Sequence, residues 1–206
     1  MKRIAIIEDD HAIRENYMDL MQRYGYQVEG YSGREQAMLA FNSRLPDLAV
    51  IDVGLGHEYD GGFLLCQQLR QLSASLPIIF LTARDNDFDS ISGLRLGADD
   101  YLSKEIGLEH LMVRISALFR RIGLSESNTQ SQHNILQRGA LTIDNDKMQI
   151  SWEGNNLEVT ITEFWIIHAL AHKSGVVKSR QQLMTDANMV VDDNTITSHI
   201  KRIRKK

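Results

Sequence analysis

Several side chains that could hold a metal ion or a phosphoryl group stand at the ends of short apolar runs. Glu8 and Asp9 follow "RIAII", Asp52 follows "LAVI", Thr82 ends "PIIFLT" and Lys104 follows "DDYLS". Two carboxylates about 5 Å apart repel each other by roughly 3 kcal/mol at an effective dielectric constant of about 20, so a carboxylate cluster favours extra protons or a hard cation such as Mg2+. A hydroxyl and an ammonium group can stabilise a phosphoryl group in transit. These residue types therefore indicate phosphoryl transfer onto an Asp52 nucleophile.

These residues can meet only if a sheet brings the ends of the apolar runs together. Through the first 120 residues, short apolar runs alternate with segments whose apolar residues recur every three or four positions. This alternation predicts an α/β domain with a doubly wound, five-stranded parallel sheet covered by helices on both faces. The carboxyl ends of parallel strands share one edge, so Glu8, Asp9 and Asp52 converge if the first and third strands are neighbours.

The sequence changes character after the first domain. Residues 123–137, "GLSESNTQSQHNILQ", lack periodicity and are rich in Ser, Asn and Gln, which predicts a linker between a first domain, 1–122, and a second domain, 138–206. In the second domain, short strand patterns precede three helical patterns. This order predicts a small α+β domain of the winged helix-turn-helix kind.

The last predicted helix, from about Asp193, has one apolar and one cationic side. In "DDNTITSHIKRIRKK", Ile196, Ile200 and Ile203 fall on one stripe, and polar and basic residues occupy the opposite side. No acidic residue follows Asp193, so this side could neutralise phosphates and reach base edges in a major groove. An ordinary solvated helix end is the alternative that charge alone would favour.

Composition limits the class of protein. The chain has 206 residues, a net charge of −4 and one cysteine, Cys66, so an intramolecular disulfide is excluded. The net charge is −5 over residues 1–122 and +1 over residues 123–206. The sequence has neither a run of 18 apolar residues nor a basic, apolar-cored leader, which predicts a cytoplasmic protein without membrane contact.

Residues 1–122 resemble the receiver domain of two-component response regulators, which has a flavodoxin-like fold. The resemblance rests on "IAIIEDD", "LAVID", "FLTARD", "GLRLGADDYLSK" and "RISALFRR". It implies that Asp52 accepts a phosphoryl group from a sensor histidine kinase and that Thr82 and Lys104 bind the phosphoryl oxygens, with Tyr101 moving inward as Thr82 closes. It also implies a Mg2+ site made of Glu8, acting through water, Asp9, Asp52 and the Gly54 carbonyl.

The loop after Asp52 departs from the receiver pattern. In "VGLGHEYDGG", Gly56 stands where Pro is common and one extra residue precedes Asp60, so we expect a more mobile loop. Glu105 replaces the usual Pro after Lys104. The stretch "IDVGLGHEYDGG" resembles regulators that accompany dedicated sortase systems, which indicates a possible sub-family.

Residues 138–206 resemble the effector domain of OmpR/PhoB-type regulators through "VTITEFWIIHALA", "GVVKSRQQL" and "NTITSHIKRIRKK". The resemblance implies that the last helix recognises double-stranded promoter DNA, and the implied contact residues are Asn194, Ser198, His199, Lys201, Arg202 and Arg204. His199 lies near the apolar stripe, so packing is its alternative role. The family continues into a β-hairpin wing, whereas this sequence stops at Lys206, and a domain without its wing is expected to bind DNA poorly.

The resemblance further implies a homodimer that forms on phosphorylation through the fourth helix, fifth strand and fifth helix. The charged residues expected at this surface are Arg95, Asp99, Asp100, Glu109 and Arg114. Solvated helix charges are the alternative, since exposed ion pairs contribute only about 0–1 kcal/mol each.

Two other functions stay open on the sequence. If the basic helix binds a partner protein, the chain is a phospho-switch module without a DNA output. A Mg2+-dependent phosphatase with an Asp nucleophile would need a second Asp two residues after Asp52, where Gly54 stands. The sequence therefore predicts a phosphorylation-dependent transcriptional regulator. Such a protein is a stoichiometric phosphoacceptor, with self-catalysed phosphoryl transfer and autodephosphorylation, and not a turnover enzyme.

Overall fold

The computed structural model describes residues 1–83, 87–126 and 135–206. The chain folds into two compact units, residues 1–112 and 113–206. The division falls inside one long helix, so the domain limits expected from the sequence stay predictions. In the part of the chain that the structure describes, no helix is both long and apolar enough to cross a membrane.

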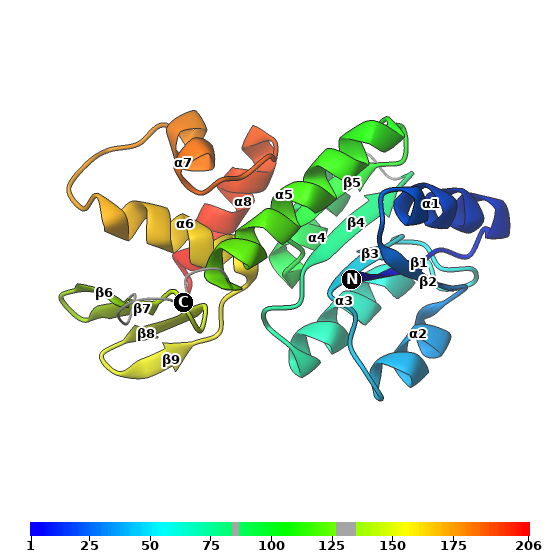
Figure 1. Ribbon diagram of the computed structural model, residues 1–206, viewed down its shortest axis with the longest axis horizontal. Helices are drawn as coiled ribbons and strands as arrows, with labels where there is room; N and C mark the ends of the chain where they lie inside the picture. The colour runs from blue at the N-terminus through cyan, green and yellow to red at the C-terminus, as the bar shows by residue number, and fades with distance from the viewer. Residues whose placement is uncertain (84–86, 127–134) are drawn as a thin grey trace. The chain divides into compact units, whose positions relative to one another are not determined.

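The first unit is built on a parallel sheet of five strands, as the alternating pattern predicts (Figure 1). The strands lie in the order β2-β1-β3-β4-β5. Their bounds are β1 Arg3–Ile7, β2 Gln27–Tyr31, β3 Leu48–Ile51, β4 Ile78–Thr82 and β5 Asp100–Ser103. Ile7 of β1 is in register with Ile51 of β3, so the residues that follow these two strands lie side by side.

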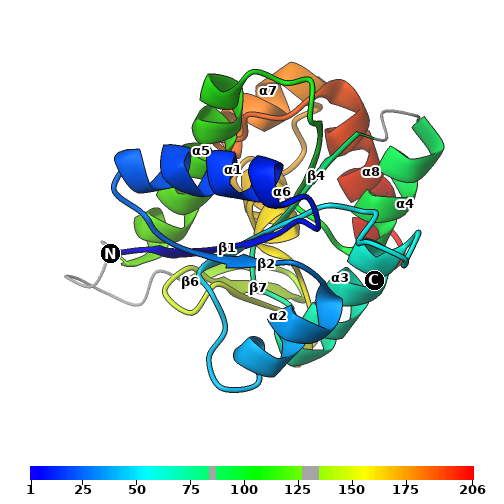
Figure 2. The same ribbon diagram turned by 90° about the vertical axis from the view of Figure 1, so that its right-hand side faces the viewer.

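Helices lie on both faces of this sheet because the central strands are apolar on both sides. All residues of β3 and β4 are buried. The helices that follow the strands are α1 His11–Arg23, α2 Arg34–Phe41, α3 Gly61–Leu72, α4 Asp87–Leu96 and α5 Leu108–Glu126. Helix α1 covers one face, and α2 and α3 cover the other (Figure 2). On the latter face, the Phe80 ring contacts the rings of Phe63 and Tyr101, with centroids 5.2 and 5.9 Å apart.

Helix α3 begins very close to the end of β3. The Gly62 N–H donates to the Val53 carbonyl at 2.9 Å, and a Cβ atom on Gly62 would lie 2.0 Å from the Asp52 carbonyl oxygen. Real Cβ atoms do not approach an oxygen this closely, so only glycine fits here. The glycine pair in "DGG" therefore allows α3 to pack against the backbone of Asp52.

The second unit combines an antiparallel sheet, in the order β6-β7-β8-β9, with three helices. The bounds are β6 Ile135–Arg138, β7 Leu141–Asp144, β8 Gln149–Trp152, β9 Asn155–Leu157, α6 Ile161–His172, α7 Arg180–Asp186 and α8 Asp193–Ile203. Ile143, Ile150 and Phe164 belong to one buried cluster between the sheet and α6. This order confirms the predicted small α+β domain.

Polar side chains begin the helices of the second unit. Thr160 and Glu163 form a capping box at the start of α6, and Ser179 and Gln182 form another at the start of α7. The Asp192 carboxylate accepts a backbone N–H of the first turn of α8. Such caps satisfy N–H groups that have no partner within the helix, so they fix where each helix begins.

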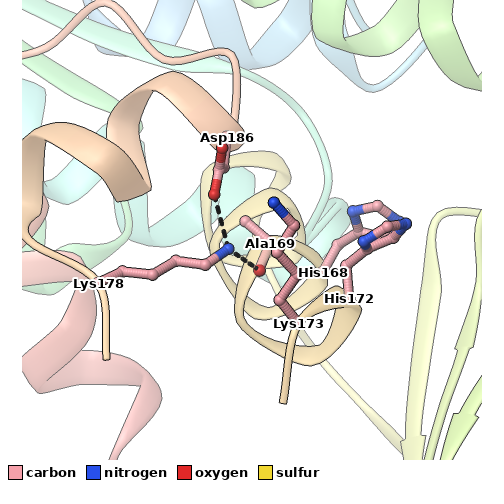
Figure 3. A pocket seen from close by; sticks show the side chains of 6 residues that line it. All are labelled: His168, Ala169, His172, Lys173, Lys178 and Asp186. Carbon is pink, nitrogen blue, oxygen red and sulfur yellow. Dashed lines mark hydrogen bonds and ion pairs between the residues drawn. The ribbon is translucent and has the colours of Figure 1, made fainter. Parts of the chain in front are cut away.

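Lys178 ties α6 to α7 (Figure 3). Its Nζ atom lies 2.6 Å from the Ala169 carbonyl oxygen and 2.7 Å from Oδ2 of Asp186. The Lys178 side chain holds the pKa of the Asp186 carboxyl below its usual value. His168 and His172 line the same hollow, where burial, aided by the neighbouring His172 and Lys178, lowers the pKa of His168. The contacts of Lys178 fix the helix pair that supports α8.

A helix and a strand overlap the two ends of the segment expected to be a linker, whose limits stay a prediction. Helix α5 continues to Glu126 and β6 begins at Ile135, so only residues 127–134 of the segment 123–137 remain, and these lie outside the described residues. A helix that is already formed extends at little cost, so α5 continues through residues 123–126. Strand β6 was missed because its four residues carry no clear alternation.

Candidate functional site

Three carboxylates meet at the carboxyl edge of the parallel sheet. Glu8 and Asp9 follow β1, Asp52 follows β3, and each offers an oxygen within 4.8 Å of the others. The convergence expected from the strand order is therefore present. Glu8 and Asp52 are buried, with 3% and 9% of their surface exposed, whereas Asp9 is exposed. One side of the cluster thus opens to solvent.

Lys104 completes this cluster from the end of β5. Its Nζ atom lies 2.6 Å from Oδ2 of Asp52 and 2.6 Å from Oε2 of Glu8. Burial opposes the charged form of Lys104, but the hydrogen bonds to the two carboxylates outweigh it and raise the pKa of the ammonium group. Burial raises the pKa of Glu8, which the bond to Lys104 only partly offsets. The site therefore has a deficit of positive charge that a further cation would relieve.

Thr82 and Tyr101 belong to the two strands next to Asp52. Thr82 is the last residue of β4, is almost fully buried, and accepts the Lys104 N–H at its carbonyl oxygen at 2.7 Å. Tyr101 lies in β5 with 6% of its surface exposed, packed beside Phe80, so its ring points inward in this structure. Both residues lie near the edge that carries the carboxylates, and their roles in a switch stay predictions.

Backbone contacts hold the acidic residues in position. The Val53 N–H donates to Oδ1 of Asp52 at 2.6 Å, which leaves Oδ2 to face Lys104. On the other strand, Nη1 of Arg14 donates to the Glu8 carbonyl at 2.5 Å and to the Asp9 carbonyl at 3.3 Å. Sequence reasoning missed Arg14, although its position one helical turn after "EDD" was a usable signal.

The loop after β3 carries Gly54, the predicted carbonyl ligand. Leu55 and Glu58 exchange two backbone hydrogen bonds of 3.0 and 3.1 Å, and Gly56 between them has a φ of +62°, which glycine adopts readily. The side chain of Glu58 also forms an ion pair with Arg34. This loop is thus more extensively bonded than the expectation of mobility assumed.

The second candidate site is α8. Ile196 is fully buried, and Ile200 and Ile203 pack against the same cluster, so the predicted apolar stripe is present. Ser198 and His199 are also buried, His199 completely. The packing role that was the alternative for His199 is the one in this structure, because position 199 lies three residues after Ile196 and shares its side of the helix.

The basic residues of α8 divide into two groups. Lys201 and Arg204 are exposed, as is Asn194 near the start of the helix. Arg202 instead directs its Nε atom to Oε1 of Glu163 at 3.0 Å, and Glu163 is fully buried. The structure thus leaves Asn194, Lys201 and Arg204 accessible to a partner. Ser198 and His199 are buried and Arg202 is paired, so their accessibility does not support the DNA contacts expected of them.

The residues expected at a dimer surface are not equally accessible. Arg95 and Glu109 are exposed and Arg114 is half-buried. Asp99 is fully buried, where its Oδ2 atom pairs with Nη2 of Arg70 at 3.1 Å and accepts the Ile78 N–H at 3.0 Å. Asp100 is also buried and accepts the Tyr101 N–H. The carboxylate of Asp99 therefore makes its contacts within the first unit. A dimer surface stays a prediction.

Comparison with known proteins agrees with both units. Residues 4–116 match the response regulator receiver domain, and residues 154–206 match the C-terminal domain of transcriptional regulatory proteins. The chain is 32% identical over 209 residues to the sensory transduction protein BceR of Halalkalibacterium halodurans, covering 100% of this chain and 88% of that one. It is 34% identical over 207 residues to the transcriptional regulatory protein CreB of Escherichia coli, covering 98% and 87%.

Solved structures agree over the whole length. The response regulator DrrB of Thermotoga maritima, an OmpR/PhoB homolog, has a TM-score of 0.54 at 25% identity, with 100% of this chain and 88% of that chain covered. A mutant of RitR shares the fold with a TM-score of 0.79 at 20% identity, covering 100% of this chain and 90% of that chain.

A receiver sheet with an acidic edge, followed by a helix-turn-helix unit, defines a response regulator with a transcriptional output. The chain belongs to the OmpR/PhoB-type response regulators, which are phosphorylation-dependent transcriptional regulators of two-component systems. The narrower resemblance to regulators of sortase systems stays a prediction.

Proposed function

We propose that Asp52 accepts the phosphoryl group that activates this regulator, with a sensor histidine kinase as donor. The P–N bond of a phosphohistidine breaks as a bond forms between phosphorus and a carboxylate oxygen of Asp52. The observation that carries the proposal is the cluster that Asp52 forms with two other acids, with the Lys104 ammonium 2.6 Å from the Oδ2 atom of Asp52. The chain acts as a stoichiometric acceptor that catalyses its own loading and its own slow hydrolysis.

The donor set fits Mg2+. Carboxylates within 4.8 Å of one another, one of them exposed, offer the oxygen ligands that this ion prefers and leave room for its waters. Asp9, Asp52 and the Gly54 carbonyl would ligate the ion directly, and Glu8 would act through water. The bound cation supplies charge that neutralises the phosphoryl oxygens.

Lys104 and Thr82 act on the phosphoryl group once it is attached. Lys104 exchanges its bonds to Glu8 and Asp52 for a bond to a phosphoryl oxygen, and the Thr82 hydroxyl donates to another. These contacts exist only in the phosphorylated state, so they shift an equilibrium between two conformations toward the one in which Thr82 closes on the phosphoryl group and Tyr101 stays inward, as it is in this structure. The shift favours a homodimer.

DNA binding follows from the exposed face of α8. Lys201 and Arg204 would neutralise phosphates and Asn194 would reach a base edge in the major groove of promoter DNA. A dimer places two such helices on two half-sites, which raises the effective affinity.

The first experiment measures acid-labile phosphate on the chain after incubation with acetyl phosphate and Mg2+. The Asp52→Asn variant should incorporate none, and Asp19→Asn, which alters an exposed carboxylate of α1, should incorporate as much as the wild type. Undiminished incorporation by Asp52→Asn would place the acceptor elsewhere.

The second experiment titrates the phosphorylated chain against promoter DNA at several salt concentrations. Affinity should fall steeply as salt rises, because DNA binding releases counterions. A salt-independent response would reject a DNA output and favour a partner protein.

A further inference from the structure

An ion pair joins the start of α2 to the loop after the phosphoacceptor. Nε of Arg34 lies 2.8 Å from Oε2 of Glu58, and Nη2 of Arg34 lies 2.7 Å from Oε1 of Glu58. This is the parallel two-bond arrangement of a guanidinium and a carboxylate, which fixes direction as well as distance. The pair links residues 24 positions apart in the chain.

Glu58 is joined to the predicted metal site by its backbone. Its N–H and its carbonyl both bond to Leu55, and its carbonyl also accepts the N–H of Gly61, the first residue of α3. Leu55 directly follows Gly54, whose carbonyl is the proposed Mg2+ ligand. The position of Glu58 is therefore coupled to that of the Gly54 carbonyl through the two backbone hydrogen bonds between Glu58 and Leu55.

The residues on either side of Gly54 are buried in the core of the first unit. Val53 is fully buried and Leu55 is 5% exposed, so both side chains anchor the loop in the core. The Arg34 pair adds the contact that fixes the outer part of the loop, which the sequence made unusually long. The guanidinium also holds the pKa of the Glu58 carboxyl below its usual value, so the pair stays ionised at neutral pH.

We infer that Arg34 and Glu58 are positioning residues that hold the loop so that the Gly54 carbonyl is ready to bind Mg2+. This inference rests on the proposed function, since it concerns the metal of that site. Mutation of a residue that contacts a metal ligand commonly weakens metal binding by about 10- to 100-fold. The Arg34–Glu58 pair lies further from the proposed Mg2+ site than such a residue, so its effect should be smaller. We expect Mg2+ to bind about three- to tenfold more weakly when the pair is broken.

The test measures Mg2+ binding to the full chain by titration calorimetry, without a phosphodonor. The variants are Arg34→Met, Glu58→Gln and the two combined. The matched control is Arg3→Met, which breaks the 2.9 Å ion pair of Arg3 with Glu29 at the opposite end of the sheet. The dissociation constant should rise in the first three variants and stay within twofold of the wild type in the control. The double variant should be no weaker than the weaker single variant, because both changes remove one interaction.

Three outcomes separate the claims. Equal Mg2+ affinity in Arg34→Met, Glu58→Gln and Arg3→Met would overturn the positioning role, and so would additive losses in the double variant. The Asp9→Asn variant reports on the site itself and should lose most of the binding. If the wild type and Asp9→Asn take up Mg2+ equally poorly, the proposed function fails and not only this inference.

Discussion

The Nζ atom of Lys104 lies 2.6 Å from Oδ2 of Asp52, so the ammonium group occupies the side of the carboxylate that also faces Glu8. Before phosphorylation, this one cation balances two buried acids. An arriving phosphoryl group must replace these bonds, and Lys104 is already within reach of it. Under the proposed function, the ion pair would both stabilise the resting state and place a donor for the phosphorylated state.

Replacing Lys104 by Met should destabilise the metal-free chain. Two buried carboxylates would lose their shared counter-charge, which we expect to lower the free energy of unfolding by about 2 kcal/mol, less than for a wholly buried pair because Lys104 is partly exposed. Mg2+ should reduce this deficit, since a divalent cation also balances the acids. Urea unfolding with and without Mg2+ measures both effects.

The control is Lys147→Met, which breaks an exposed pair with Asp144 and should change stability little. A Lys104→Met variant as stable as this control without Mg2+ would show that the acids do not depend on the ammonium group.

Replacing Gly62 by Ala should directly disturb Asp52, the proposed phosphoacceptor. The new Cβ atom would lie 2.0 Å from the Asp52 carbonyl oxygen, so either α3 or the end of β3 must move. Overpacking of this kind costs typically about 1–3 kcal/mol, and we expect phosphate incorporation to fall as well. Thermal unfolding and acetyl phosphate labelling check the two effects. Gly33→Ala is the control, because its Cβ would meet nothing within 4 Å. Equal behaviour of the two variants would contradict the close approach.

The sequence was sufficient to predict the sheet, the convergence of Glu8, Asp9 and Asp52, and the apolar stripe of α8. Each of these depends on a short-range period or on the rule that parallel strands end at one edge. The links of Arg34 with Glu58 and of Arg202 with Glu163 join residues far apart in the chain, and charged surface residues carry no period that could reveal them. The orientation of α8 followed from three Ile residues, which also left packing open for His199, but the width of its buried side depends on α6, so the sequence could not decide between packing and DNA contact for that residue.

We expect the Tyr31 phenol to lose its proton at a higher pH than an ordinary tyrosine does. Burial, strengthened by the hydrogen bond to Glu29, raises the pKa of Tyr31 from 10.0 to about 12. Because the folded-state pKa is the higher one, the stabilisation is complete below pH 10 and is lost as the pH rises from 10 to about 12. An absorbance titration of the phenolate should show one step near pH 12 that Tyr31→Phe removes. The persistence of that step in Tyr31→Phe would assign it to another of the six tyrosines.

The two groups of cations on α8 should respond differently to mutation. Lys201 and Arg204 are exposed, so replacing both by Ala should weaken DNA binding, lower the slope of log affinity against log salt by about 2, and leave stability nearly unchanged. Arg202→Met should instead lower the free energy of unfolding by about 1–2 kcal/mol. It removes a cation that pairs with the buried Glu163, while the pair of Glu163 with Lys206 at 2.8 Å stays in place. Mobility-shift titrations over salt and urea unfolding separate the two effects. A salt slope that falls as much for Arg202→Met as for a single exposed cation would mean that Arg202 leaves Glu163 to contact a phosphate when DNA binds.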